Sequence, residues 1–253
     1  LMLVILPPSE TKVSGGDEKH PLNISTLSFG SQNSLRESLV DQTIELSSDS
    51  ARARKALKLG PKGDAEIARN RLVRESAGMP ALFRYTGVLY DALELESMEE
   101  DALSHAQSTL SIFSALWGLI RATDVIPAYR LSWDSMLPCG GVRNQWRPAR
   151  EPLWQEVEGF VLDVRSEGYR SLAPVPSNRG VYVALVTPGE PGSRPALGHA
   201  NKAVKGKFVR ELLTSGETLE SVADFADWGS KYGYEVDSSS HQDGRIEVVI
   251  SGS

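Results

Sequence analysis

The sequence predicts a mixed α/β (α+β) fold in a single domain, and three observations lead to this prediction. Apolar, strand-like runs lie near both ends of the chain, and helical segments lie between them. No linker-like stretch divides the 253 residues. A chain of this length can form one large domain with a buried core. We therefore expect one domain over residues 1–253, built on a mixed sheet.

The amino-terminal part of the chain is expected to place one buried strand before a polar loop and a helix. The opening run "LMLVIL" is apolar and ends at Pro7 and Pro8, which indicates a strand. Residues 9–33 are polar and contain "SGG", so they are interpreted as a loop. A helical stretch is expected over residues 35–46.

Residues 52–74 form the most basic part of the chain. The stretch "ALKLGPKGDAEIARNR" predicts a helix end, a turn at Gly60–Gly63 and a second helix. Eight Lys and Arg against two acids give this segment a charge of +6, whereas the whole chain carries −6. Charge of one sign on an oppositely charged body attracts anionic ligands. A solvated helix face is the alternative interpretation.

The remaining segments alternate between helix and strand. In residues 98–120, Leu103, Ala106, Leu110 and Phe113 recur at helical spacing, which predicts one long helix with a core face. Residues 121–143 are expected to be irregular, 153–164 to run from helix into strand, and 180–188 to be a strand. A helix closed by Gly216 is expected over 201–216, followed by two strands within 232–251 joined at Asp243-Gly244.

Several classes of protein and site are not supported by the sequence. The single cysteine, Cys139, excludes an intrachain disulfide and suits a reducing cytoplasm. The opening apolar run is too short for a membrane segment, so we expect a cytoplasmic protein with no membrane partner. The four histidines lie far apart and no nucleotide-binding glycine motif is present. We therefore expect no bound metal and no cofactor.

Four separated segments resemble the peroxide stress protein YaaA family. They are "LPPSETK", "RYTGVLYDAL", "FSALWGLIRATDVIPAYRLSW", and "NKAVKGKFVREL" together with the later "DFADWGSKYGYEVDSSS". They follow the family's order along the whole chain, although many relatives have Lys where Glu10 stands. The resemblance implies one domain of unusual topology with a positively charged cleft, a helix-hairpin-helix element and DNA binding. It also implies a role in limiting peroxide damage, with lower free iron as the proposed route, and no particular reaction.

Residues 52–74 are the candidate helix-hairpin-helix. In such an element a glycine turn lets backbone N–H groups approach a phosphate at a helix N-terminus. Gly60 and Gly63 supply the turn, and Lys58, Lys62 and Arg69 flank it. These contacts would position a DNA duplex without reading its bases. An ordinary helix corner remains the alternative.

A second candidate cluster lies in the helix expected over residues 201–216. Lys202, Lys205, Lys207 and Arg210 occur there without an intervening acid, beside an apolar stripe. A solvated helix more often mixes charges of both signs. The pattern therefore favours binding of an anion, with solvation as the alternative.

Further candidates follow expected element ends. Arg121, Tyr129 and Arg130 follow the expected long helix, where Arg can bind phosphate and Tyr can stack on a base. Capping of the helix C-terminus by Arg121, or its pairing with Asp124, is the alternative. Lys12 follows the first strand, close to the strand end where α/β clefts form.

The run Asp237, Ser238 and Ser239 is expected at a strand end. Its hydroxyls and carboxylate are candidates for ligand binding, and Asp237 is the candidate acid or base of any reaction. Simple turn chemistry is the alternative.

Two functions follow from these observations. The preferred function is sequence-independent DNA binding that limits oxidative damage, through phosphate contacts in a basic cleft. The alternative is an enzyme acting on a small anionic or nucleotide-like substrate in a pocket lined by Arg and Lys. Direct iron binding is disfavoured because His and Cys do not cluster.

Overall fold

Strand β1 (Met2–Leu6) lies within the seven-stranded sheet, and all five of its residues are buried. The structure is a computed structural model that describes residues 1–198, 201–242 and 244–251. The other strands of this sheet are β4 (Leu110–Ser114), β5 (Gly118–Arg121), β9 (Phe160–Asp163), β10 (Gly180–Val186), β11 (Glu235–Gln242) and β12 (Arg245–Val249).

The sheet is mixed, with a parallel centre and an antiparallel strand at each edge. Its order is β11-β12-β10-β9-β1-β4-β5. Strands β12, β10, β9, β1 and β4 pair in parallel, whereas β11 and β5 pair antiparallel to their neighbours. A three-stranded sheet contains β2 (Asp17–Pro21), β3 (Ala77–Pro80) and β6 (Val125–Ile126). The pair β7 (Met136–Leu137) and β8 (Gly140–Gly141) is separate.

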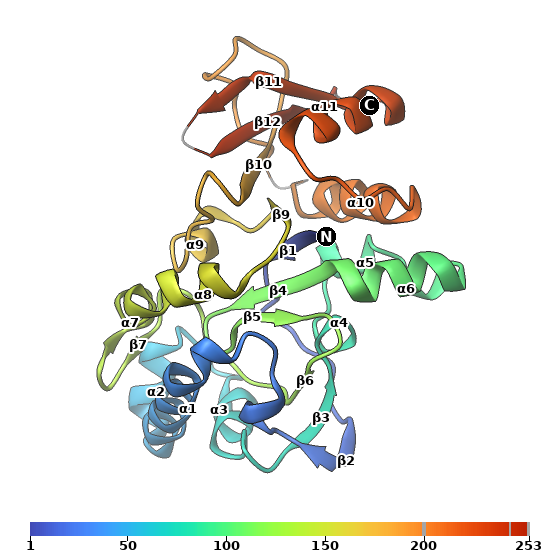
Figure 1. Ribbon diagram of the computed structural model, residues 1–253. Helices are drawn as coiled ribbons and strands as arrows, with labels where there is room; N and C mark the ends of the chain where they lie inside the picture. Colours follow the sequence, from blue (N-terminus) through green and yellow to red (C-terminus); the bar gives the residue numbers. More distant parts are fainter. Residues whose placement is uncertain (199–200, 243, 252–253) are drawn as a thin grey trace.

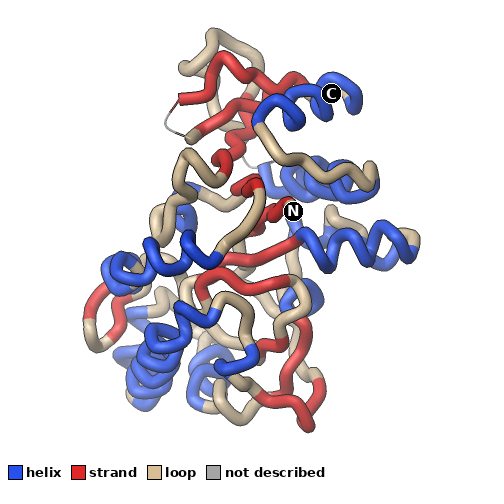
Figure 2. Tube along the Cα trace, in the orientation of Figure 1, coloured by secondary structure: helices blue, strands red, loops and turns tan. Residues whose placement is uncertain are grey.

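Helices flank the large sheet on both sides (Figures 1 and 2). The α-helices are α1 (Asn33–Ser48), α2 (Ser50–Ala56), α3 (Asp64–Arg71), α4 (Ala81–Arg84), α5 (Val88–Asp91), α6 (Glu100–Thr109), α7 (Val142–Gln145), α8 (Arg150–Glu156), α9 (Glu167–Arg170), α10 (Asn201–Thr214) and α11 (Val222–Tyr232). Short 3-10 helices are η1 (Ile24–Thr26), η2 (Gly30–Gln32), η3 (Leu95–Ser97) and η4 (Arg147–Ala149). In Figure 1, α1, α2 and α3 lie together below the large sheet, near β2 and β3.

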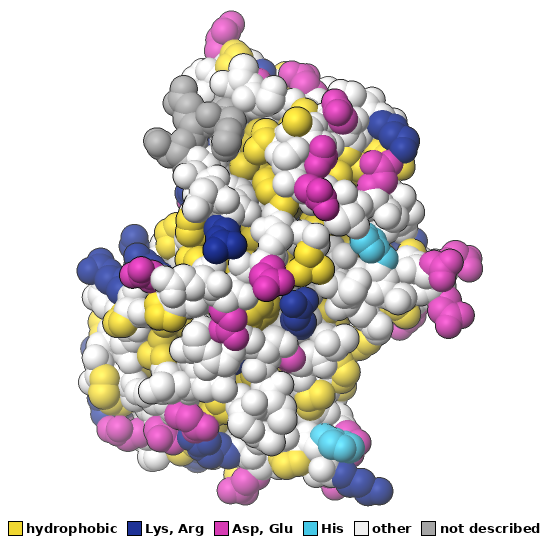
Figure 3. Space-filling view, viewed as in Figure 1, with side chains coloured by type: hydrophobic (Ala, Val, Ile, Leu, Met, Phe, Trp, Pro, Cys, Tyr) yellow, Lys and Arg dark blue, Asp and Glu magenta, His cyan; other side chains and the backbone are white. Residues whose placement is uncertain are grey.

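One large hydrophobic cluster includes side chains from β1 through β12, so the sheet and its helices share a core. No helix of the described chain combines the length and the apolar character needed to cross a membrane. Figure 3 shows acidic and basic side chains interspersed over one face of the molecule, with acidic ones at the outer end of α6.

Most expected elements are confirmed. Strand β1, helix α1, the α2–turn–α3 corner, the α8-to-β9 passage, β10, α10 and the β11–β12 pair lie where the sequence predicts them. Gly216 follows α10 with φ +67°, the left-handed conformation of a helix-ending glycine. Gly244 also has a positive φ, of +75°, whereas its predicted turn partner Asp243 lies outside the described residues.

The predicted long helix over residues 98–120 is wrong in its second half. Helix α6 ends at Thr109, and the chain continues as the antiparallel pair β4–β5. All residues from 110 to 120 are buried, so the apolar spacing reflects burial on both faces of the strands. Arg121 therefore ends strand β5 and does not cap a helix. The predicted loop over 9–33 likewise contains the exposed strand β2.

Helix α10 packs closely against α5 because Gly206 has no side chain. A Cβ at Gly206 would lie 2.3 Å from the Leu89 carbonyl oxygen and 2.6 Å from the Cβ of Ala92. Real Cβ atoms do not approach other atoms this closely, so any larger residue would push the two helices apart. This contact fixes the position of α10 relative to the segment that carries α5.

We expect Gly206→Ala to destabilise the protein, although alanine is the better helix former. The clash should cost about 1–3 kcal/mol, which exceeds the gain of about 1 kcal/mol in helix propensity. Gly60→Ala is the control, because no atom lies within 4 Å of the Cβ built there. Urea unfolding followed by circular dichroism measures both changes. A Gly206→Ala variant as stable as the wild type would contradict the proposed packing constraint.

Candidate functional site

A cavity of about 950 Å3 lies at the carboxyl ends of the central parallel strands. The segment after β1, from Pro7 to Thr11, lines one part of it, and Ser166 and Tyr169 after β9 line another. The chain passes from β1 to β4 on one side and later returns to β9 on the other, so the strand order reverses between β1 and β9. Open α/β sheets bind ligands at such reversal points.

Charged side chains of both signs line this pocket, with cations in excess. Four cations, Lys58, Arg130, Lys202 and Lys205, face it together with two carboxylates. The carboxylates are those of Glu10 and Asp134. The excess of positive charge lies on a chain whose net charge is −6.

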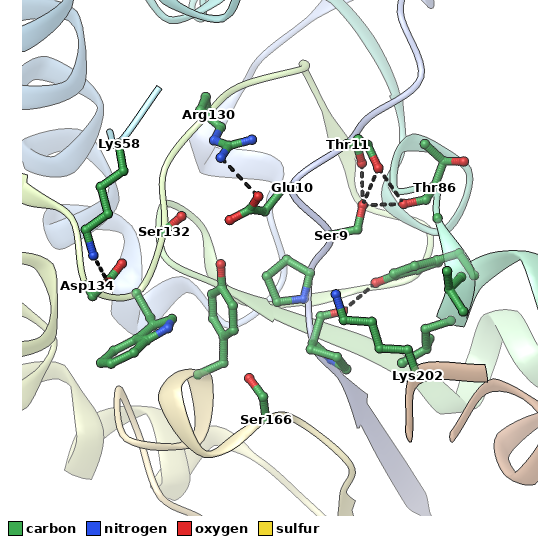
Figure 4. Close-up of a pocket in the computed structure, with 18 of the residues that line it drawn as sticks. Ser9, Glu10, Thr11, Lys58, Thr86, Arg130, Ser132, Asp134, Ser166 and Lys202 are labelled. Atoms are coloured by element: carbon green, nitrogen blue, oxygen red, sulfur yellow. Dashed lines mark hydrogen bonds and ion pairs between the residues drawn. The ribbon is translucent and has the colours of Figure 1, made fainter. Parts of the chain in front are cut away.

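Two ion pairs form across the pocket wall (Figure 4). The Arg130 guanidinium donates to Glu10 with Nη2 and Oε2 3.0 Å apart, and the Lys58 ammonium contacts the Asp134 carboxylate. Lys202 lies on the opposite side of the hollow in Figure 4 and is exposed. Within the described part of the chain, no carboxylate forms an ion pair with Lys202.

Hydroxyl groups form a second part of the wall. The Ser9 hydroxyl donates to the backbone carbonyl of Thr86, and Thr11 Oγ1 donates to the same oxygen at 3.0 Å. These bonds tie the segment after β1 to the residues just before α5 (Figure 4). The wall therefore consists of chain segments that are far apart in the sequence.

Lys205 is the most enclosed of the four cations. Its side chain is 6% exposed, and Nζ donates to the backbone carbonyl of Arg165 at 3.2 Å. Burial lowers the pKa of Lys205 to about 8, although the negative charges of Asp163 and Glu167 act in the opposite direction. The neutral fraction of this amine near neutral pH is therefore larger than that of an ordinary lysine, although the protonated form still predominates.

A fully buried ion pair holds the floor of the pocket. Arg165 donates to both carboxylate oxygens of Asp163, from Nε to Oδ1 at 2.8 Å and from Nη2 to Oδ2 at 2.7 Å. Both side chains are fully inaccessible to solvent. Arg165 also donates to the carbonyls of Tyr169 and Ala173. The pair thus fixes the segment that brings Ser166 and Tyr169 to the pocket.

Aromatic rings add an apolar part to the lining. Trp133 and Tyr169 both line the pocket and are partly exposed. The indole of Trp133 packs on Gly168, where a Cβ would lie 2.4 Å from the ring. The close packing holds the indole against α9. Such rings can stack on a flat ligand group or a base.

Lys12 lies behind the pocket wall, outside the residues that line the cavity. Its Nζ donates to the carbonyls of Ser9 at 2.9 Å and Glu10 at 3.1 Å, and lies 4.2 Å from the ring centre of Tyr129. Burial, together with repulsion from Arg130, lowers the pKa of Lys12 to about 7. Through these contacts Lys12 stabilises the conformation of the segment after β1.

The structure leaves several predicted anion-binding residues outside the pocket. Arg69 pairs with Glu66, and Arg210 donates to the carbonyls of Leu93 and Glu94. Arg69 also donates to the Ser14 hydroxyl, so it joins α3 to the segment before β2, and Arg210 joins α10 to the segment after α5. Lys62 and Lys207 are exposed and do not line the cavity.

The predicted site residues Arg121, Tyr129 and Arg130 do not lie together in the structure. The Arg121 guanidinium lies 5.3 Å from the ring centre of Phe29. The predicted pairing partner Asp124 instead accepts the backbone N–H of Arg121 at 3.0 Å. Tyr129 is buried, with its hydroxyl 2.7 Å from that of Tyr85, so its ring is not open to a base. Of this group, only Arg130 reaches the pocket.

The run Asp237–Ser239 lies inside strand β11, at the sheet edge, and not at a strand end as predicted. The Asp237 carboxylate accepts from Arg194 Nη1 at 2.5 Å and from the Ser239 backbone N–H at 3.0 Å. Hydrogen bonds from Ser239 and Arg194 lower the pKa of Asp237. Ser238 and Ser239 are exposed, and none of the three residues lines the pocket.

In the α2–α3 corner, two helices flank a turn, as in a helix-hairpin-helix, but the turn does not have a glycine in the left-handed conformation. Gly60 and Gly63 both have negative φ, and the left-handed residue is Lys58, with φ +53°. The Arg54 guanidinium donates to the carbonyls of Gly60 and Pro61 and binds the adjacent Asp64. Lys58 contacts Asp134 at the pocket, so its side chain forms part of the pocket wall.

Several residues that line or support the pocket were not found from the sequence. Ser166 and Tyr169 follow β9 as Ser9 follows β1, so applying the strand-end rule to the second strand would have found them. Asp163 and Arg165 stand two residues apart where an apolar strand ends, which is a signal for a buried pair. Trp133 and Asp134 lie in an irregular segment that gives no local signal. In the described chain, no group of three His, Cys, Asp or Glu could hold a metal ion.

Comparison with known proteins identifies the family. The family model described as peroxide stress protein YaaA matches residues 2–240. The chain belongs to the peroxide stress protein YaaA family. It is 38% identical to a UPF0246 protein of Streptomyces coelicolor, over 93% of this chain and 92% of that protein. It is 36% identical to a UPF0246 protein of Corynebacterium glutamicum, over 98% of this chain and 100% of the relative.

We expect Asp163→Asn to destabilise this YaaA-family protein strongly. Arg165 would keep its charge in the core without a carboxylate, a loss of about 3–5 kcal/mol for a broken buried pair. Arg74→Gln is the control, because Arg74 pairs with Glu37 and Asp41 at the surface and solvent screens such pairs. Urea unfolding should show a much larger loss for Asp163→Asn, and equal losses would contradict the role of the buried pair.

Lys12 should make stability depend on pH. Its pKa falls from the ordinary lysine value of 10.5 to about 7 in the folded chain, so the unfolded chain binds more protons between these two values. The free energy of unfolding contributed by Lys12 should therefore rise with pH above about 7 and be lowest below it. Lys12→Met should remove this rise, measured by urea unfolding at several pH values. Parallel pH profiles for the two proteins would refute the assignment.

Proposed function

We propose that this YaaA-family protein acts in the cytoplasm during peroxide stress by binding DNA without sequence preference. Its phosphate contacts come from the cationic side chains gathered at the pocket, and the binding limits oxidative damage to the DNA. The carrying observation is that Lys58, Arg130, Lys202 and Lys205 come from distant segments of an acidic chain and meet at one cavity. Positive charge concentrated in a hollow attracts polyanions.

The cations at the pocket differ in how each could contact a phosphate. Lys202 is exposed at the pocket, so it can reach a phosphate at the surface. Arg130 and Lys58 can exchange their carboxylate partners, Glu10 and Asp134, for phosphate oxygens. Phosphate contacts of this kind position a duplex and carry no base readout.

The second candidate function is that of an enzyme that binds and acts on a small anionic or nucleotide-like ligand. The cavity of about 950 Å3 has the size of a small-molecule site, and its lining includes Trp133 and Tyr169. A phosphate among the lysines and a base against the rings would satisfy both parts of the lining.

Lys202→Glu should weaken binding to all DNA duplexes alike, by roughly tenfold, or about 1.4 kcal/mol. It should also reduce the slope of log affinity against log salt by about 1. Lys207→Glu is the matched control, because Lys207 is exposed on the same helix but does not line the pocket. Fluorescence anisotropy with labelled duplexes at two or more salt concentrations measures both effects.

Equal losses in the two variants would show that the pocket does not direct the binding. Absent or salt-independent DNA binding, with saturable binding of a mononucleotide, would instead select the second candidate. Competition between a mononucleotide and duplex DNA in the wild-type protein would place both ligands at the same pocket.

A further inference from the structure

We propose that the side-chain amine of Lys205 forms a Schiff base with an aldehyde carried on a phosphorylated ligand. This reaction goes beyond DNA binding, because it makes the pocket a covalent site. It rests on the proposed function only in placing the ligand's phosphate beside the other cations of the pocket.

The position of Lys205 meets the geometric needs of an amine nucleophile. Its side chain lines the cavity and is 6% exposed, so a bound ligand would reach it while bulk water largely would not. An ammonium group has three N–H donors, and the one contact described for Nζ is to the Arg165 carbonyl at 3.2 Å. Among the described residues, Nζ makes no second hydrogen bond, and the side chain lines the cavity from which a carbonyl carbon would approach.

The charges around Lys205 leave its amine without an ion pair. Asp163, the first of two carboxylates that act on it, already binds Arg165 through both oxygens. Within the described residues, no carboxylate forms an ion pair with Lys205. A lysine that is desolvated and unpaired is readily deprotonated, which is the condition for attack on a carbonyl.

The other lysines near the pocket lack this combination. Lys12 has the lower pKa, but it lies outside the lining, and two carbonyls and the ring of Tyr129 enclose its nitrogen. Lys202 lines the pocket but is exposed, and Lys58 pairs with Asp134. Geometry therefore selects Lys205 among the lysines at this site.

The reaction balances without any further reactant. The neutral amine attacks the aldehyde carbon, a C–N bond forms, and the carbonyl oxygen becomes the hydroxyl of a carbinolamine. A proton taken up from solvent lets that hydroxyl leave as water and gives the protonated imine, and release of this proton leaves the neutral imine. The aldehyde and the amine are thus converted to the imine and one water, with no change in oxidation state.

The neighbouring groups indicate which aldehydes fit. Lys202 lies one helical turn from Lys205 on α10, and Arg130 lies on the pocket wall, so a phosphate can bind while the aldehyde points to Lys205. Two sources share this chemistry: a free short-chain aldehyde phosphate, and the aldehyde of a base-free deoxyribose between two phosphates of DNA.

Reductive trapping tests the proposal on the whole 253-residue chain. The protein is incubated with glycolaldehyde phosphate and cyanoborohydride, which reduces the imine to a stable amine, and the adduct is mapped by peptide mass spectrometry. We expect the modification at Lys205 to exceed that at any other lysine by about tenfold, and Lys205→Arg to abolish it. Lys207→Arg, on the same helix but outside the pocket, should leave the yield unchanged.

Mapping on the wild-type protein keeps the test decisive even if a variant folds poorly. Adducts spread evenly over exposed lysines, or an undiminished yield in folded Lys205→Arg, would overturn the proposal. Trapping by unphosphorylated glycolaldehyde should be about tenfold weaker than by its phosphate, and equal trapping would overturn the phosphate part.

A second set of reactions distinguishes the two sources and separates this proposal from DNA binding. A duplex with one abasic site is offered in place of the small aldehyde. Trapping of that duplex at Lys205 would assign the DNA aldehyde, and trapping of only the small phosphate would assign a free metabolite. If intact duplexes fail to bind while Lys205 still traps the small aldehyde phosphate, the proposed function fails and this inference stands.

Discussion

The buried ion pair between Asp163 and Arg165 is the constraint on which the candidate site depends. It lies where β9 ends, and both side chains are fully buried. Arg165 binds the carboxylate through two nitrogens and also binds carbonyls further along the chain. A charge pair in the core needs these bonds, because a missing carboxylate leaves an uncompensated charge and a missing carbonyl leaves a buried N–H donor unsatisfied. The chain after β9 therefore has little freedom, and its residues reach the pocket in fixed positions.

This constraint also explains the chemistry of Lys205. The carboxylate that would otherwise pair with this lysine is already occupied by Arg165, and Arg165 offers Lys205 a backbone carbonyl. The Asp163–Arg165 pair thus satisfies charge below the pocket, whereas Lys205 has no ion-pair partner among the described residues. Gly206, next in sequence, lets α10 lie against the backbone of α5 and brings the amine to the cavity. Packing and electrostatics therefore act together on one short piece of α10.

The expected basic cleft becomes a pocket of mixed charge in the structure. Arg130 and Lys58 meet carboxylates at the pocket wall, and other predicted cations, such as Arg210, hold helices together. A cluster of cations in a sequence shows how much positive charge is present, but it does not show which side chains are already bound in structural contacts. Only the fold separates structural cations from those available to a ligand, because the carbonyls and carboxylates that bind these cations come from distant segments.

The sequence by itself determined the mixed α/β class, most of the elements and the family. Local pattern sufficed for these, since a buried strand such as β1 and a helix such as α10 are specified by neighbouring residues. It misassigned β4 and β5 because full burial removes the alternation that marks a strand. The tertiary structure alone decided the pocket. Lys58, Arg130, Lys202 and Lys205 meet there through strand order and helix packing, which depend on contacts between residues far apart in the chain.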